Sequence, residues 1–367
     1  MVDPRLTKLA HILINYSIEL QAGQLLQINA NTLAAPLVRE IYRAALEVGA
    51  YPLVRLGMED LEGLLYTYGS DEQLSYVPAV TRQEYEEIDA YVSILASENT
   101  RRLSGVDPRK IAMRRQALGD LQRRTMARVA EGSLKWVGTL FPTQAAAQDA
   151  EMSLADYEEF VFGAGKLDLD DPVAAWRAVR DEQQRVADLL GTKRVIRLVA
   201  PGTDLTYHTA GRGWLNADGT QNFPDGEVYT SPDETRTTGH IHFTFPAVYQ
   251  GSEIAGIRLA FEDGRVVQAT ADKGEDLLRA LLDLDEGARR LGEAAFGLNY
   301  QISRFSRNTL FDEKIGGTIH LALGQAFPSV GGQNSSALHW DLVCDMRAGG
   351  RAYADGELIY QDGKFVV

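Results

Sequence analysis

Cysteine, basic clusters and long hydrophobic runs are scarce in this chain, and each scarcity excludes a class of protein. One cysteine, Cys344, among 367 residues rules out an intramolecular disulfide framework and is consistent with a reducing compartment. No apolar run approaches the ~20 residues of a membrane-spanning helix, and the start of the chain lacks the basic-then-apolar order of a signal peptide. The sequence therefore predicts a soluble, cytoplasmic protein with no membrane partner.

Basic residues are outnumbered, since 37 Lys and Arg stand against 51 Asp and Glu, a formal net charge of -14 with neutral His. No run of Lys or Arg offsets this charge, so nucleic acids and anionic membranes are poor partners. Small neutral or cationic ligands suit the composition better.

The pattern of the chain changes near its middle, and its length predicts two domains. Over residues 1–192, strands such as Leu25–Asn29 alternate with helices, which predicts an α/β domain with a mostly parallel sheet. Over residues 193–367, short strands separated by Asp-Gly turns predict an α+β domain with a mostly antiparallel sheet. One long helix, from about Glu275 to Gly292, is expected to interrupt these strands and to end beside Glu293.

Potential metal ligands gather in the second half. In a strand, side chains at i and i+2 lie on one face, so His339 and Asp341 are placed to hold one cation together, with His320 shortly before them. His240 and His242 have the same spacing and form a rival pair, for which an ordinary polar sheet surface is the alternative.

Two glutamates complete a possible two-metal set. Glu227 follows a turn and Glu293 lies close to arginines, so each alone has an ordinary explanation as a solvated or ion-paired residue. Together with the imidazoles and Asp341, however, they give three carboxylates and two imidazoles. Such a set can hold two divalent ions when one carboxylate bridges, and a metal pair of this kind activates water for hydrolysis.

Seven segments in the second half, in this order, carry a family resemblance: Gly202–Leu205, Pro224–Pro232, Tyr249–Gly251, Ala288–Glu293, Asn308–Glu313, His320–Gly324 and Ser335–Asp341. In these segments the sequence resembles the thermophilic metallo-aminopeptidases of the aminopeptidase T type. The resemblance implies a homodimeric, two-domain exopeptidase that releases N-terminal residues from small peptides. It also implies two divalent ions on Glu227, Glu293 as the bridge, His320, His339 and Asp341. Zinc, cobalt and manganese all accept such mixed ligands.

The chain departs from the family at Phe327, where the resemblance implies a catalytic tyrosine seven residues after His320. A phenyl ring cannot donate a hydrogen bond to a developing oxyanion, and losing one such donor costs about 10²–10³ in rate. Tyr229 and Tyr300 are the candidates to fill the space opposite Phe327.

Glu313 is the candidate general base, since it lies in a polar pair close in sequence to His320. Asp312 is the alternative, and either carboxylate could instead pair with Lys314.

The sequence thus predicts a metal-dependent aminopeptidase that uses a metal-activated water at a two-metal site. A catalytically weak or silent homologue, acting as a peptide-binding or assembly module, is the main alternative, because Phe327 removes an expected donor. Another two-metal hydrolase, such as an amidase or phosphoesterase, is a third. Retention of all five candidate ligands argues against the silent homologue, because a buried cluster of carboxylates lowers the stability of the fold unless it binds a cation.

Overall fold

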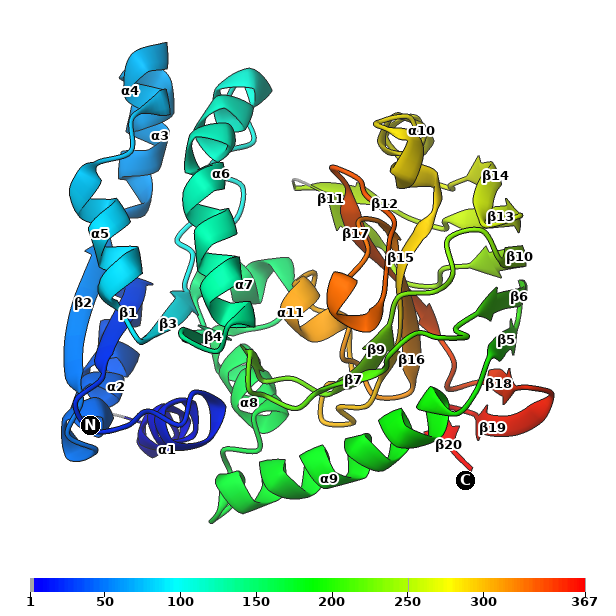
Figure 1. Cartoon of the computed structure of the whole chain (residues 1–367), viewed down its shortest axis with the longest axis horizontal. Coiled ribbons are helices and arrows are strands. Elements are labelled where there is room, and N and C mark those ends of the chain that lie inside the picture. Colours follow the sequence, from blue (N-terminus) through cyan, green and yellow to red (C-terminus); the bar gives the residue numbers. More distant parts are fainter. Residues whose placement is uncertain (1–2, 250, 367) are drawn as a thin grey trace. The chain divides into compact units, whose positions relative to one another are not determined.

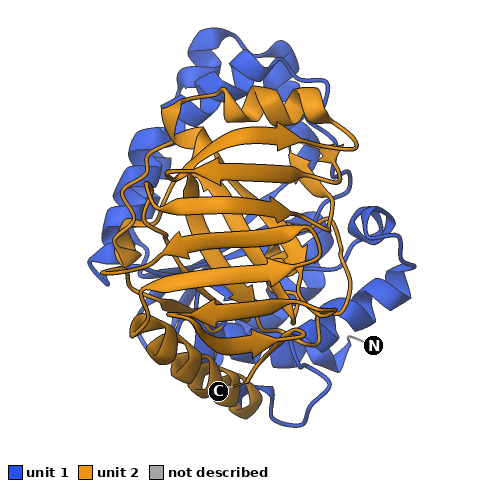
Figure 2. Cartoon of the chain, turned by 90° about the vertical axis from the view of Figure 1, so that its right-hand side faces the viewer, with its two compact units in different colours: residues 1–173, 219–224 blue, residues 174–218, 225–367 orange. Residues whose placement is uncertain are grey.

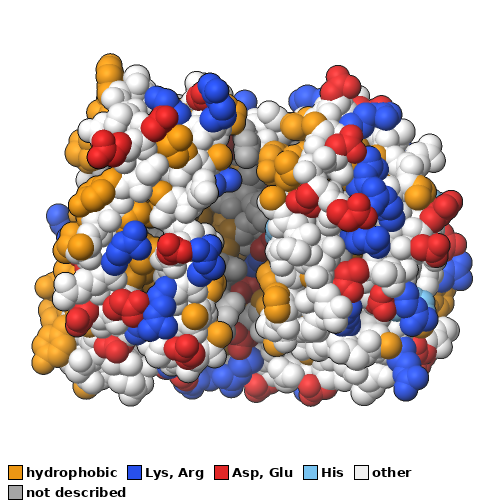
Figure 3. Space-filling model, turned by 45° about the horizontal axis from the view of Figure 1, so that its top comes forward, with side chains coloured by type: hydrophobic (Ala, Val, Ile, Leu, Met, Phe, Trp, Pro, Cys, Tyr) orange, Lys and Arg blue, Asp and Glu red, His pale blue; other side chains and the backbone are white. Residues whose placement is uncertain are grey.

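The computed structural model describes residues 3–249 and 251–366. The chain divides into two compact units, residues 1–173 with 219–224 and residues 174–218 with 225–367 (Figure 2). On the face seen in Figure 3, acidic and basic side chains are interspersed. None of the helices in the described part of the chain has the length and hydrophobicity needed to cross a membrane.

Unit 1 is built on a parallel five-stranded sheet in the order β2-β1-β3-β4-β8 (Figure 1). This confirms the expected α/β fold with a parallel sheet. The strands are β1 (Leu25–Asn31), β2 (Tyr51–Gly57), β3 (Ala90–Leu95), β4 (Lys135–Leu140) and β8 (Asn222–Phe223). The helices are α1 (Pro4–Ile12), α2 (Ala35–Glu47), α3 (Glu59–Tyr68), α4 (Asp71–Ser75), α5 (Ala79–Glu87), α6 (Pro108–Ala130), α7 (Gln144–Asp149) and α8 (Leu154–Ala164).

Unit 2 contains two larger antiparallel sheets and a small one, which confirms the expected antiparallel α+β fold. The eight-stranded sheet is ordered β14-β13-β10-β6-β5-β18-β19-β20, and the five-stranded sheet β17-β16-β15-β9-β7. Strands of the first are β5 (Val195–Ala200), β6 (Thr203–His208), β10 (Thr237–His242), β13 (Arg258–Glu262), β14 (Arg265–Thr270), β18 (Arg351–Ala354), β19 (Glu357–Gln361) and β20 (Lys364–Phe365). Strands of the second are β7 (Leu215–Ala217), β9 (Glu227–Thr230), β15 (Leu291–Gly297), β16 (Thr318–Gly324) and β17 (His339–Asp345), while β11 (Ala247–Tyr249) pairs with β12 (Ser252–Ile254).

The five-stranded sheet turns one face to the core of unit 2. Phe296, Leu321 and Leu342 belong to the same buried cluster as Leu198 and Leu259 of the eight-stranded sheet. Because successive side chains of a strand alternate between faces, the residues between these apolar positions lie on the opposite face.

Helix α9 (Pro172–Gly191) groups with unit 2 from Ala174 onward. The buried Gln183 side chain donates to Asn216 Oδ1 at 2.7 Å and to the carbonyl oxygen of Ala217 at 3.0 Å, which ties the helix to β7. The expected domain boundary after residue 192 stays a prediction, since compact contact units need not fold independently.

The prediction of one long helix from about Glu275 to Gly292 is wrong. Helix α10 covers Glu275–Leu282, a 3₁₀ turn follows at Glu286–Arg289, and β15 begins at Leu291. Asp285 caps the 3₁₀ turn by accepting from the amide of Ala288 at 2.9 Å, which starts a new turn instead of continuing the helix. Glu293 consequently lies in a strand and not at a helix end.

Candidate metal centre

The face of the five-stranded sheet that points away from the apolar core gathers the expected ligands from four strands. Strand pairing sets Gly297 beside Glu227, and Ala295 beside both Tyr229 and His320. Ala322 lies beside Asp341 in the same way. Alanine and glycine between the polar residues leave space above the sheet, so long side chains from neighbouring strands converge over this floor.

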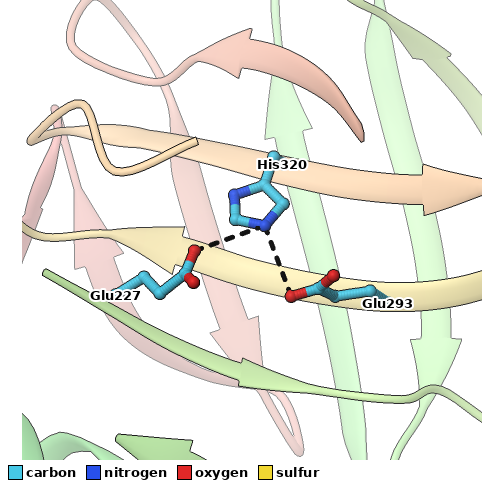
Figure 4. A group of neighbouring side chains, drawn as sticks. All are labelled: Glu227, Glu293 and His320. Carbon is cyan, nitrogen blue, oxygen red and sulfur yellow. Dashed lines mark ion pairs between the residues drawn. The ribbon is translucent and has the colours of Figure 1, made fainter. Parts of the chain in front are cut away.

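A first group consists of Glu227, Glu293 and His320, all buried (Figure 4). The Nε2 atom of His320 lies 3.4 Å from Glu227 Oε2 and 3.5 Å from Glu293 Oε1. One ligand atom from each residue lies within 4.8 Å of the others, which is the spacing of donors around one cation.

A second group consists of Glu293, His339 and Asp341. The Nε2 atom of His339 lies 3.3 Å from Glu293 Oε2 and 3.6 Å from Asp341 Oδ1. The two carboxylate oxygens of Glu293 therefore face different histidines, as a bridging carboxylate would.

Both imidazoles are held in the tautomer that a metal requires. Nδ1 of His320 lies 2.9 Å from the carbonyl oxygen of Glu313, and Nδ1 of His339 lies 2.8 Å from that of Gln325. Since a carbonyl only accepts, each Nδ1 carries the proton and donates it. In each ring Nε2 is thereby left facing the carboxylates, where it is placed to bind a cation once its proton is displaced.

The donor set fits a cation in charge as well as in shape. Glu227 Oε2 and Asp341 Oδ1 are buried and form no hydrogen bond within the described residues. Burial, together with the charges of Glu313 and Glu293, raises the pKa of Asp341 to about 6. Burial opposes charge on His320, but its contact with Glu293 and the charge of Glu227 prevail and raise its pKa to about 10. These shifts show carboxylates in need of a positive partner.

Lys314 is a positive partner that the sequence analysis did not assign to the site. Its side chain is fully buried, and Nζ lies 3.3 Å from Glu227 Oε1 and 3.8 Å from Asp225 Oδ1, with a third contact to Glu313. Burial opposes its charge, but these three carboxylates raise its pKa well above the usual value. An adjacent Glu-Lys pair in sequence gives no signal of such burial, because Asp225 and Glu227 come from a distant strand and turn.

The structure separates the two candidates for the base. Glu313 offers an oxygen within 4.8 Å of ligand atoms of His320 and Asp341. Asp312 instead accepts from the amide and the hydroxyl of Ser306, at 2.6 and 2.8 Å. Burial raises the pKa of Asp312 to about 7.

Beside Glu313 and Asp341 lies a pocket of mixed lining. Its apolar part includes Phe305, Val343 and Ala247, and its polar part includes Arg307, Thr309 and Asp312 together with the two carboxylates. Apolar and polar groups that converge on one pocket are typical of a small-ligand site.

The remaining candidates fall outside the two groups. His240 and His242 belong to no group of potential metal ligands found among residues 3–249 and 251–366. Cys344 is buried on the core face of β17, and burial raises the pKa of its thiol to about 12.

Comparison with known proteins now gives the class. The sequence model of the thermophilic metalloprotease family (M29) matches residues 2–365 of this chain. The chain belongs to this metalloprotease family, and it is accordingly a hydrolase. The resemblance to aminopeptidase T noted in the sequence is confirmed.

Individual relatives agree. Aminopeptidase 2 of Geobacillus stearothermophilus is 34% identical over 353 residues, which cover 89% of this chain and 85% of the relative. Aminopeptidase T of Thermus aquaticus is 30% identical, covering 88% of this chain and 85% of the relative. The solved structure of wild-type AmpT from Thermus thermophilus aligns with a TM-score of 0.88 at 27% identity and covers 99% of both chains. The roles of the individual site residues stay predictions.

Proposed function

We propose that the protein is an aminopeptidase that uses two divalent cations to release N-terminal residues from small peptides. The proposal depends mainly on the position of the Glu293 carboxylate, whose Oε1 faces His320 and whose Oε2 faces His339. Glu227 and His320 would hold one cation, His339 and Asp341 the other, and Glu293 would bridge them.

The negative charge gathered at the site favours bound cations. Asp225, Glu227, Glu293, Glu313 and Asp341 give five negative charges, and Lys314 gives one positive charge. With neutral imidazoles the formal sum is -5 + 1 = -4, which two divalent ions neutralise. Uncompensated charge at such depth is costly.

In the proposed reaction, bound cations supply the Lewis acidity that activates a water molecule and polarises the peptide carbonyl. Glu313 accepts a proton from that water as the water oxygen bonds to the carbonyl carbon. The same carboxyl then gives the proton to the leaving amine as the C–N bond breaks. The contact with Lys314 would hold the Glu313 carboxylate in place during both transfers.

The free amino terminus of the substrate is proposed to lie in the pocket beside the site. Three carboxylates, Asp312, Glu313 and Asp341, line this pocket together with Arg307, and Asp312 is the one that the proposed cations do not neutralise. The apolar walls formed by Phe305 and Val343 suit the first side chain. Zinc or cobalt is the proposed ion, with manganese as the alternative, because carboxylate and imidazole ligands accept each of them.

We further propose a homodimer, as the family resemblance implies, and a cytoplasmic location, which the single cysteine favours. Light scattering of the purified protein tests the dimer, and a mass of one chain at micromolar concentration would contradict it.

The activity is tested with one peptide in two forms, with its amino terminus free or acetylated. Metal-free protein is supplied with zinc, cobalt or manganese, and products are followed by mass spectrometry. We expect release of the first residue from the free form alone, and loss of that release in Glu293→Gln. Binding of the peptide without cleavage under every metal would instead favour the silent homologue.

A further inference from the structure

Tyr229 lies on the same face of β9 as Glu227, two residues further along the strand. Across the sheet, Tyr229 and His320 both pair with Ala295, so only an alanine methyl separates the tyrosine from the imidazole in that row. The Tyr229 side chain is therefore built into the same surface as the candidate ligands.

Phe327 directs the tyrosine ring. The two ring centroids are 5.3 Å apart in an edge-on arrangement, and Phe327 packs in the same way on His339, at 5.1 Å. The amide of Phe327 donates to Ser231 Oγ at 2.9 Å, which fixes the phenyl ring over the end of β9. Phe327 thus fills the space between Tyr229 and His339 but offers no hydroxyl.

The Tyr229 hydroxyl itself is uncommitted. None of the hydrogen bonds found among the described residues involves it. Neighbouring hydroxyls are already engaged, since Thr230 Oγ1 donates to the carbonyl oxygen of Gly213 and Ser231 Oγ to that of Gly292, both at 2.6 Å.

Tyr300, the other tyrosine considered from the sequence, lies elsewhere. Its hydroxyl donates to the carbonyl oxygen of Gly363 at 2.8 Å, and half of the residue is exposed. It therefore provides a control for the loss of a tyrosine hydroxyl in unit 2.

We propose that Tyr229 is a catalytic residue that donates a hydrogen bond from its hydroxyl to the oxygen of the scissile carbonyl as that oxygen becomes negative. The inference rests on the proposed aminopeptidase function. An oriented donor of this kind stabilises the transition state more than the substrate, so its loss acts on kcat.

Four proteins test the proposal: wild type, Tyr229→Phe, Phe327→Tyr and the double variant Tyr229→Phe/Phe327→Tyr, each loaded with the same metal. We expect Tyr229→Phe to lower kcat by about 10²–10³ with KM changed less than about threefold. In the double variant, the hydroxyl on the adjacent ring should raise kcat at least tenfold above that of Tyr229→Phe. Tyr300→Phe should match the wild type.

Three further readings separate this role from a structural one. Metal content per chain and the melting temperature should be unchanged in Tyr229→Phe, while binding of a phosphinic dipeptide analogue, followed by calorimetry, should weaken at least tenfold. If the wild type is active and the kcat of Tyr229→Phe lies within threefold of it, the proposed role of Tyr229 is overturned and the aminopeptidase function is left intact. A wild type that binds metal but cleaves no peptide would overturn the function, and the Tyr229 role with it.

Discussion

At the scale of single residues, the cluster around Lys314 shows how buried charge holds the site together. The ammonium group is fully buried and contacts Asp225, Glu227 and Glu313. Replacing it by an apolar residue leaves carboxylates unpaired in a low-dielectric environment, which costs more than the loss of the contact itself.

We therefore expect Lys314→Met to lower the free energy of unfolding of the metal-free protein by about 3–5 kcal/mol. The matched control is Lys273→Met, because Lys273 pairs with Glu253 at 2.9 Å while its side chain is 65% exposed. An exposed pair contributes at most about 1 kcal/mol. Urea denaturation of both variants gives the comparison, and equal losses would contradict the account of Lys314.

At the scale of elements, β15 determines the geometry of the site because it carries Glu293 between β9 and β16. The strand runs close to the segment that supplies Glu313. A Cβ added to Gly297 would lie 2.3 Å from the carbonyl oxygen of Ile315 and 3.1 Å from that of Glu313. Only glycine permits this approach.

Gly297→Ala should consequently destabilise the protein by about 1–3 kcal/mol through overpacking, and it should displace Glu313. Gly191, the last residue of α9, is the control, since a Cβ there meets no atom within 4 Å. Differential scanning calorimetry should find a lower melting temperature for Gly297→Ala and an equal or slightly higher one for Gly191→Ala. A Gly297→Ala protein as stable as the wild type would refute the packing argument.

The elements also show what the sequence can predict. Alternation places His339 and Asp341 on one face of β17 and Cys344 on the other, and this follows from strand geometry alone. The placement of Glu293 in a strand does not follow from the local sequence. The helical periodicity that begins at Glu275 continues in the sequence beyond Leu282, where the helix ends, and the Asp285 cap starts a separate turn. The roles of Lys314 and Tyr229 depend on pairing between distant strands, which local sequence does not encode.

At the scale of the whole molecule, the charge of the candidate metal centre links metal binding to stability. Ions that bind the folded state alone stabilise it, by about 2.7 kcal/mol at a free concentration 100 times the dissociation constant. Chelation should therefore lower the melting temperature, and restoring the metal should recover it.

This difference should grow with pH. In the metal-free protein, His320 and His339 have pKa values raised to about 10 and 9, and that of Asp341 is raised to about 6. Groups with raised pKa values stabilise the fold while protonated. The contribution of the two histidines is therefore lost as pH rises from about 6.5 through about 9 and 10, whereas that of Asp341 is already lost between about pH 4 and 6. Glu293, with a pKa lowered to about 2, acts oppositely but only below about pH 4.5.

Protons and cations compete for the same carboxylates and imidazoles, so the metal-loaded protein escapes this loss. Melting curves at pH 6, 7.5 and 9, with and without metal, should show a widening gap. A gap that narrows as pH rises would contradict the assignment of these residues to a cation site.

The most direct test of the two-metal aminopeptidase is the rate of N-terminal residue release as metal is added to metal-free protein in measured equivalents. We expect hydrolysis to reach its plateau only at two ions per chain, and Glu293→Gln to show no release at any ratio. A plateau at one ion per chain, or release that continues in Glu293→Gln, would contradict the bridging role of Glu293 and with it the two-metal site.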